Sequence, residues 1–265
     1  MSKKLKRLFS KNRKQKPSDS LAKGFHIDSD QKTLLMTMTN EPFQFARIHY
    51  NLLKKNELEK IFSKLKCIDY DPGNKRWVWL YYAEAKILKF KKSYNDIPQK
   101  FHPIVIGSFF MPTNDRMYLD VNSFDRAIIA IQFFDKFINR NILFLSHIQV
   151  VNKLFEAVPG IIPKPNEYFD SDCPNKPNEN SPLDALVEDE TLDQSKKQSL
   201  AFQYIEDEAK KPIEQVESLP VHFYEDGIEG LEGCLKMRHV IAYEHWRGNK
   251  NYSFNDLIQK MFSGS

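Results

Sequence analysis

The sequence predicts an α+β protein in which a mainly antiparallel sheet packs against a few helices. Three observations lead to this expectation. Short segments rich in β-branched and aromatic residues recur with turn sequences between them. Two longer segments, 56–65 and 123–138, carry apolar residues at helical spacing. Hydrophobic residues make up 41% of the chain, which is enough for a packed core.

The expected strands share runs of apolar residues or an alternation of apolar and polar residues. They lie at 32–39, 43–53, 67–70, 76–82, 102–112, 117–122 and 142–151. The sequence DPGN at 71–74 is strong turn chemistry, and it joins two of these strands as a hairpin.

Helices are expected where a capping residue precedes an apolar stripe. Asn56 and Glu59 have the spacing of a capping box at the start of the helix at 56–65. Ser253 and Asp256 repeat this spacing before a short C-terminal helix.

The clearest helix lies at 123–138, with a wide apolar face and with Asn122 or Ser123 as its cap. Another helix is expected at 189–211, where apolar residues recur between charged ones. The segment 219–246 contains three glycines in its middle, so strands are expected at its two ends.

Two stretches, 43–70 and 117–151, both run strand, helix, strand over similar lengths. This rhythm is compatible with two pseudo-repeated β-α-β units. It is equally compatible with a single α+β domain, because such domains commonly mix strands and helices in this way.

Composition divides the chain into four parts. They are a basic disordered arm at 1–24, an α+β core at 25–158, a flexible acidic and Pro-rich linker at 159–188, and a helical or mixed segment at 189–265 that packs on the core. The arm holds nine bases and one acid, whereas residues 166–219 hold five bases and 14 acids. A chain polarised in this way favours an anionic partner for its basic front.

The first sixteen residues contain eight cations and no acid. These cations are Lys3, Lys4, Lys6, Arg7, Lys11, Arg13, Lys14 and Lys16. Burying unpaired charge is costly, so the arm must stay solvated or meet anions. The sequence therefore predicts a polyanion-binding arm, with RNA or the ribosome as the first expected partner and an anionic membrane surface as the second. A protein partner is a third alternative.

The sequence lacks the common catalytic and phosphate-binding motifs. It has no G-x-x-x-x-G-K-[ST], G-x-G-x-x-G, H-E-x-x-H or G-x-S-x-G. The candidate metal ligands are His222, His239 and His245 with Glu225 or Asp226. Histidines among aromatic and aliphatic neighbours usually have structural roles, so we expect no metal and no cofactor. The sequence favours a protein that is not an enzyme.

Four side chains are candidates for acid–base chemistry. Asp69 and Asp71 border a turn, where aspartates commonly bind the backbone. Asp120 is expected to pair with Arg116. His147 is the best lone candidate for a functional side chain, although a histidine in so apolar a strand is more often hydrogen-bonded for structural reasons.

Trp77 and Trp79 alternate along a strand that is followed by a lysine-rich stretch at 85–94. Aromatic rings on a sheet face ringed by cations bind single-stranded nucleic acid by stacking. The competing interpretation is that a tryptophan-rich strand belongs to the core, which predicts that Trp77 or Trp79 is buried.

Several stretches resemble a family of cyanobacterial and plastid proteins of uncharacterised function. They are RWVWLYYAEAKILKF, HPIVIGSFF, and DRAIIAIQFFDKFINRN with HIQVVNKLFEA. The resemblance covers about half the chain, carries no catalytic motif, and implies a bacterial cytoplasm or a plastid stroma. Cys67, Cys173 and Cys234 agree with a reducing compartment, because they are odd in number and form no C-x-x-C pair.

These features predict a non-enzymatic binding or assembly protein that uses its basic arm to engage RNA, the ribosome or another polyanion. Two alternatives stay open. The first is a nucleic-acid-acting protein, such as a nuclease or replication accessory, with an aromatic and basic sheet face. The second is a peripheral membrane protein.

Overall fold

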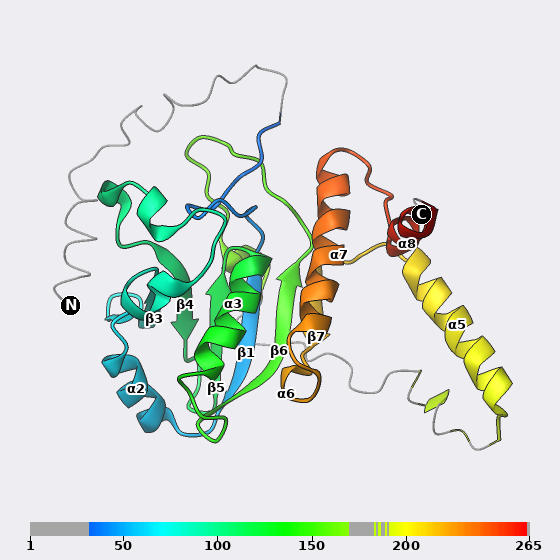
Figure 1. The fold of residues 1–265 in the computed structure, drawn as a ribbon, viewed down its shortest axis with the longest axis horizontal. Coiled ribbons are helices and arrows are strands. Elements are labelled where there is room, and N and C mark those ends of the chain that lie inside the picture. Colours follow the sequence, from blue (N-terminus) through cyan, green and yellow to red (C-terminus); the bar gives the residue numbers. More distant parts are fainter. Residues whose placement is uncertain (1–31, 170–182, 184, 187–188, 190, 264–265) are drawn as a thin grey trace.

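The computed structural model describes residues 32–169, 183, 185–186, 189 and 191–263. Within these residues, seven strands form one antiparallel sheet in the order β2-β3-β4-β5-β1-β6-β7 (Figure 1). The strands are β1 Ala46–Leu52, β2 Ile68–Asp71, β3 Arg76–Leu80, β4 Val105–Phe110, β5 Arg116–Val121, β6 Leu143–Val151 and β7 Val216–Pro220. The predicted α+β class with an antiparallel sheet is confirmed.

The helices of the described residues begin near the predicted positions in most cases. They are α2 Lys55–Lys64, α3 Phe124–Asp135, α5 Gln194–Lys210, α6 Phe223–Asp226, α7 Glu229–Trp246 and α8 Phe254–Ser263. Ser123 caps α3 by accepting a hydrogen bond from the backbone N–H of Arg126 (3.1 Å). Ser253 and Asp256 form the predicted capping box of α8. Asn56 is not a cap, because α2 already begins at Lys55.

The two faces of the sheet differ in character. On one face, here called the helix-covered face, α2, α3 and α7 pack over alternate side chains of the strands in the main hydrophobic core. This core includes Ile48 of β1, Trp79 of β3 and Leu119 of β5, each of them fully buried. Side chains along a strand alternate between faces, so Arg47, His49 and Tyr118 lie on the opposite face, here called the second face.

The second face is partly covered by the chain that follows β6. A small hydrophobic cluster forms there from Phe43, Phe45, Val151, Phe155 and Phe169. Phe169 is buried, and a 3₁₀ turn at Pro165–Glu167 precedes it. Within the predicted flexible linker at 159–188, Tyr168 and Phe169 are therefore packed on the sheet, because these aromatic residues bury apolar area, whereas Ile161 and Ile162 are exposed. Residues 170–182 lie outside the described part of the chain.

Two of the predicted strands do not form. The segment 32–39 forms only isolated bridges, between Leu34 and Glu156 and between Met36 and Pro42. The end of the segment 219–246 is helical, because α7 continues to Trp246. Buried Leu231 and Leu235 hold this helix against the core, and that packing outweighs the helix-weakening effect of the glycines.

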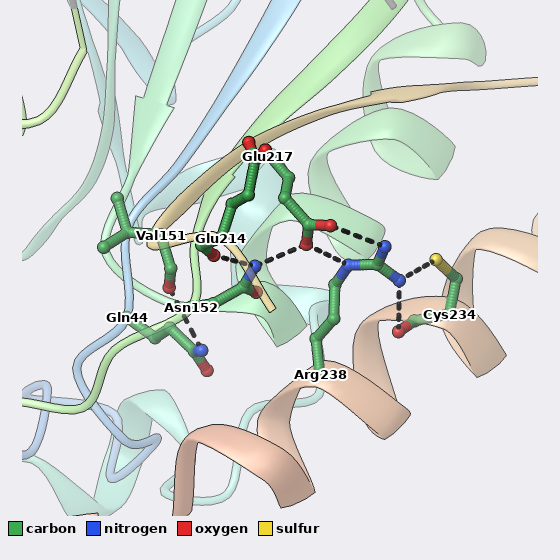
Figure 2. A network of polar contacts seen from close by, with 7 residues as sticks. All are labelled: Gln44, Val151, Asn152, Glu214, Glu217, Cys234 and Arg238. Carbon is green, nitrogen blue, oxygen red and sulfur yellow. Dashed lines mark hydrogen bonds and ion pairs between the residues drawn. The ribbon is translucent and has the colours of Figure 1, made fainter. Parts of the chain in front are cut away.

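The segment after the linker completes the sheet. β7 pairs with β6, and α7 packs against α3. Figure 2 shows the polar network that joins α7 to β7: Glu217 binds Arg238, whose Nε lies 2.8 Å from Oε2. Arg238 also donates to Cys234 Sγ one turn earlier (2.7 Å), and Asn152 donates to Glu217 from the end of β6. In Figure 1, α5 and α8 lie beyond α7 and contact each other.

The two strand-helix-strand stretches take different places in the sheet. β1 and β2, which α2 joins, are separated by three strands. β5 and β6, which α3 joins, lie on either side of β1. A single α+β unit therefore describes them better than a repeat.

Candidate functional site

The most distinctive feature of the second face is a row of rings that crosses four strands. Phe110, Tyr118, His49 and His147 are directly opposite one another in register on β4, β5, β1 and β6. The ring centroids are 5.1 Å apart for Phe110 and Tyr118, 6.1 Å for Tyr118 and His49, and 4.3 Å for His49 and His147. The two imidazoles are nearly parallel, at 5°. These four residues are called the ring row below.

A row of polar side chains runs beside the ring row on the same face, two residues away along each strand. Ser108, Asp120, Arg47, Gln149 and Ser218 follow one another in register from β4 to β7. On the other side of the ring row, Arg116 of β5 is exposed and faces Asn51 of β1. Two arginines therefore flank the rings, one buried and one exposed.

Arg47 and Asp120 form a buried two-pronged ion pair at the centre of the polar row. Arg47 donates to the carboxylate through Nε (2.7 Å) and Nη2 (2.9 Å), and its side chain is 1% exposed. The guanidinium lies 4.0 Å from the centroid of the Tyr118 ring and also donates to Asn166 (3.1 Å). The prediction that Asp120 pairs with Arg116 is wrong. Residues four apart on a strand are separated by roughly 13 Å, which is too far for an ion pair.

A β-bulge places His147 in the ring row. The pairing of β1 with β6 shifts between His49 and Tyr50, so that Ser146 has no opposite residue. Because of this extra residue, Leu145 points into the main core while His147 lies on the second face. Ser146 Oγ lies 3.0 Å from His147 Nδ1. The bulge therefore determines which side of the sheet carries the histidine.

His49 is held as a neutral imidazole. Burial, together with the neighbouring His147, lowers its pKa from 6.5 to about 4. Its Nε2 lies 2.8 Å from Gln149 Oε1, which makes Nε2 the protonated nitrogen of the neutral ring. A neutral ring with a fixed proton is suited to stacking and to hydrogen bonding.

The low pKa of His49 has a consequence for stability. The unfolded chain binds a proton at His49 near pH 6.5, whereas the folded chain does so only near pH 4. We therefore expect His49 to lower the free energy of unfolding by about 2–3 kcal/mol as the pH falls through this window. Urea denaturation at several pH values should show a shallower loss for His49→Phe than for wild type.

His222→Gln is the matched control for this measurement, because the His222 side chain is exposed. Carboxylates also destabilise the protein in acid, so the informative quantity is the difference between each variant and wild type. If the stability of His49→Phe depended on pH as strongly as that of wild type, the lowered pKa of His49 in the folded chain would be contradicted.

A groove of about 590 Å³ lies at the end of the ring row. Side chains of β3, β4 and β5 line it together with the segment that crosses them: Asn74, Arg76, Ser108, Phe110, Asp120, Asn122, Lys164 and Asn166. Its volume is in the range of small-molecule sites, and its lining includes three side-chain amides and the hydroxyl of Ser108.

Among the described residues that line this groove, the one unbalanced charge is the positive charge of Lys164. Arg47 neutralises Asp120, and Arg76 lies 3.3 Å from Asp71 while donating to Ser108 (3.1 Å). Lys164 is exposed and forms no ion pair with any described residue. An anionic ligand would therefore meet Lys164 and Arg76 beside the half-buried ring of Phe110.

The structure places the predicted stacking residues elsewhere. Trp79 is fully buried on the helix-covered face, with its ring stacked 5.6 Å from Phe133. Trp77 is half-buried between Phe62 and Tyr70, at 5.5 and 4.9 Å. Burial of Trp79 confirms the core interpretation of this strand, and an enclosed ring offers no face to a base. The eight cations of the arm lie outside the described residues.

The candidate metal ligands are dispersed. His239 and His245 lie on α7, whereas His222 precedes α6. His239 contacts Gln44, and His245 Nε2 lies 2.8 Å from the carbonyl of Tyr252. Among the described residues, no group of three or more His, Cys, Asp and Glu could hold a metal ion.

Sequence reasoning missed two of the four residues of the ring row. The alternation at 43–53 does place Arg47 and His49 on one face, and His147 was singled out. Phe110 and Tyr118 gave no such signal, because their strands look like ordinary core strands. Cross-strand register, which brings residues about 100 positions apart into contact, is not visible in local patterns.

Comparisons with known proteins found no match. No family model matches it, and no curated protein or solved structure shows significant similarity. In the part of the chain that the structure describes, no helix has the length and apolar character needed to cross a membrane.

Proposed function

We propose that this protein is a non-enzymatic RNA-binding protein that holds a single-stranded segment across the second face of its sheet. The basic arm at 1–24 adds electrostatic affinity to this surface. The observation that carries the proposal is the end of the ring row at Phe110, where a half-buried ring lines a groove with unbalanced positive charge, whereas His147 at the other end is buried.

Single-stranded nucleic acids bind sheets through two kinds of contact. Bases stack on aromatic rings, and cations follow the phosphates. Phe110 is a half-buried ring that lines the groove, whereas the Tyr118 ring is covered by the Arg47 guanidinium, so Phe110 is the ring on which a base would stack. Arg116 and Lys164 are exposed cations near the two ends of this surface. The second face therefore combines both kinds of contact in one place.

The polar groups of the second face favour binding over catalysis. Asp120 has its carboxylate engaged by Arg47, and the pKa of His49 lies at about 4. A general base works best with a pKa near the operating pH and with free access to its proton. Neither Asp120 nor His49 meets both requirements. We therefore assign these two side chains a role in shaping the binding surface.

Phe110→Ala is expected to weaken binding of a uridine-rich single-stranded RNA by about 5- to 100-fold, because stacking of one base contributes about 1–3 kcal/mol. Arg116→Ala is expected to lower affinity less and to reduce the salt dependence. Fluorescence anisotropy with a labelled oligonucleotide measures both effects.

Phe202→Ala is the matched control for Phe110→Ala. Phe202 is 72% exposed on α5, away from the second face, so its removal should leave the affinity unchanged. Equal affinities for wild type and Phe110→Ala would overturn the role of the ring row. Equal losses of RNA affinity in Phe110→Ala and Phe202→Ala would show that RNA binding does not depend on the position of the ring.

A further inference from the structure

A second cavity, of about 530 Å³, lies on the helix-covered side of the molecule, between α3, α7 and the segment 89–91. Most of its wall is apolar, from Phe90, Phe124, Ile128, Ile129, Leu235 and Val240. It lies apart from the groove of the second face, since the two cavities share no lining residue.

The cavity wall contains a buried carboxylate with unused hydrogen-bonding capacity. Glu41 is fully buried, and its Oε2 accepts from Thr37 and from Thr39 (2.6 Å) and lies 3.3 Å from Arg126 Nε. Its Oε1 has no hydrogen-bond partner within the described residues. A buried acceptor left unsatisfied is costly, and this oxygen has almost no accessible surface, so a ligand donor that reached it from the cavity would be stabilising.

His239 supplies a second acceptor at the same wall. Gln44 donates through Nε2 to the carbonyl of Val151 (3.2 Å), as Figure 2 shows, so its Oε1 faces His239 Nδ1 at 3.0 Å. His239 Nδ1 must then carry the proton, and Nε2 is an acceptor in the neutral ring. Burial lowers the pKa of His239, which keeps the ring neutral.

The charges around the cavity disfavour a charged ligand. Glu41 and Arg126 neutralise each other, and Lys236 pairs with Glu232 at 2.7 Å. The remaining lining charges are Lys89, Lys91 and Asp125, all on exposed residues. We propose that this cavity binds a neutral, largely apolar ring compound that carries N–H or O–H donors.

Indole and 1-methylindole test the proposal, because they have the same ring but only indole has an N–H donor. Titration calorimetry on the full chain should show saturable binding of indole in the millimolar range or tighter, about tenfold stronger than that of 1-methylindole. His239→Phe keeps a ring of similar shape and removes one acceptor, so it should reduce this preference to about threefold.

Val240→Trp is expected to weaken binding of both compounds, because Val240 lines the cavity from α7 and the larger side chain occupies part of it. Met237→Trp on the same helix does not line the cavity and is the matched control. The proposal is overturned if indole does not bind wild type below about 5 mM. It is also overturned if both compounds bind equally, or if Val240→Trp binds indole as well as Met237→Trp does.

Discussion

Asp120→Asn is expected to lower the free energy of unfolding by about 3–5 kcal/mol, because it leaves a buried guanidinium without its counter-charge. The Arg47 side chain is 1% exposed and is enclosed by Tyr118 and Phe169, so water cannot replace the lost carboxylate. Urea denaturation followed by circular dichroism measures the change. A loss of this size would unfold a large share of a marginally stable domain.

The exposed ion pair between Asp135 and Arg140 provides the control. Its distance is 3.4 Å, but the side chains are 28% and 52% exposed, so Asp135→Asn should change stability by no more than about 1 kcal/mol. The double variant Arg47→Met, Asp120→Leu should recover much of the loss, since no unpaired charge stays buried. If Asp120→Asn were as mild as Asp135→Asn, the pair would not be buried in solution.

Replacing the eight cations of the arm by glutamine is expected to weaken binding to single-stranded RNA by about 100-fold or more at low salt. Each phosphate contact releases counterions, so the slope of log affinity against log salt should become shallower by about 3–6. The affected residues are Lys3, Lys4, Lys6, Arg7, Lys11, Arg13, Lys14 and Lys16. Fluorescence anisotropy over a salt series gives both quantities, and an unchanged melting temperature shows that the fold is intact.

Leu8→Ala with Phe9→Ala separates RNA from an anionic membrane as the partner of the arm. In the sequence, Leu5, Leu8 and Phe9 are the apolar residues of one expected helical turn of the arm, so the loss of Leu8 and Phe9 should weaken binding to anionic vesicles and leave RNA binding unchanged. Vesicle co-sedimentation beside RNA anisotropy gives the comparison. RNA affinity that stayed at the wild-type value after the eight replacements would make the arm a solubility device.

Local chemistry in the sequence was sufficient to predict many of the elements. Ser123 and Ser253 cap helices as expected, since a cap depends only on residues three positions away. The turn at 71–74 joins β2 and β3 for the same reason. These signals are local, and nothing elsewhere in the fold competes with them.

The errors arise where tertiary contacts decide. Asp120 was assigned to Arg116, a near neighbour, but its partner Arg47 is 73 positions away and reaches it through strand pairing. The end of α7 was expected to be a strand, because glycines 230 and 233 suggested an interruption. Both glycines are exposed, so the packing of the opposite side of the helix determines the outcome.

The order of the strands has a consequence for synthesis of the chain on the ribosome. β1 is the first of the seven strands to be made but lies between β5 and β6, so both of its edges stay unpaired until residue 121 has emerged, and the edge that pairs with β6 stays unpaired until residue 151. During this interval a mostly apolar strand presents free backbone groups, which is the condition that favours aggregation of nascent chains. A chain with such non-local pairing also folds slowly, because long loops must close first. We therefore expect the unpaired edges of β1 to be a site of aggregation in the nascent chain.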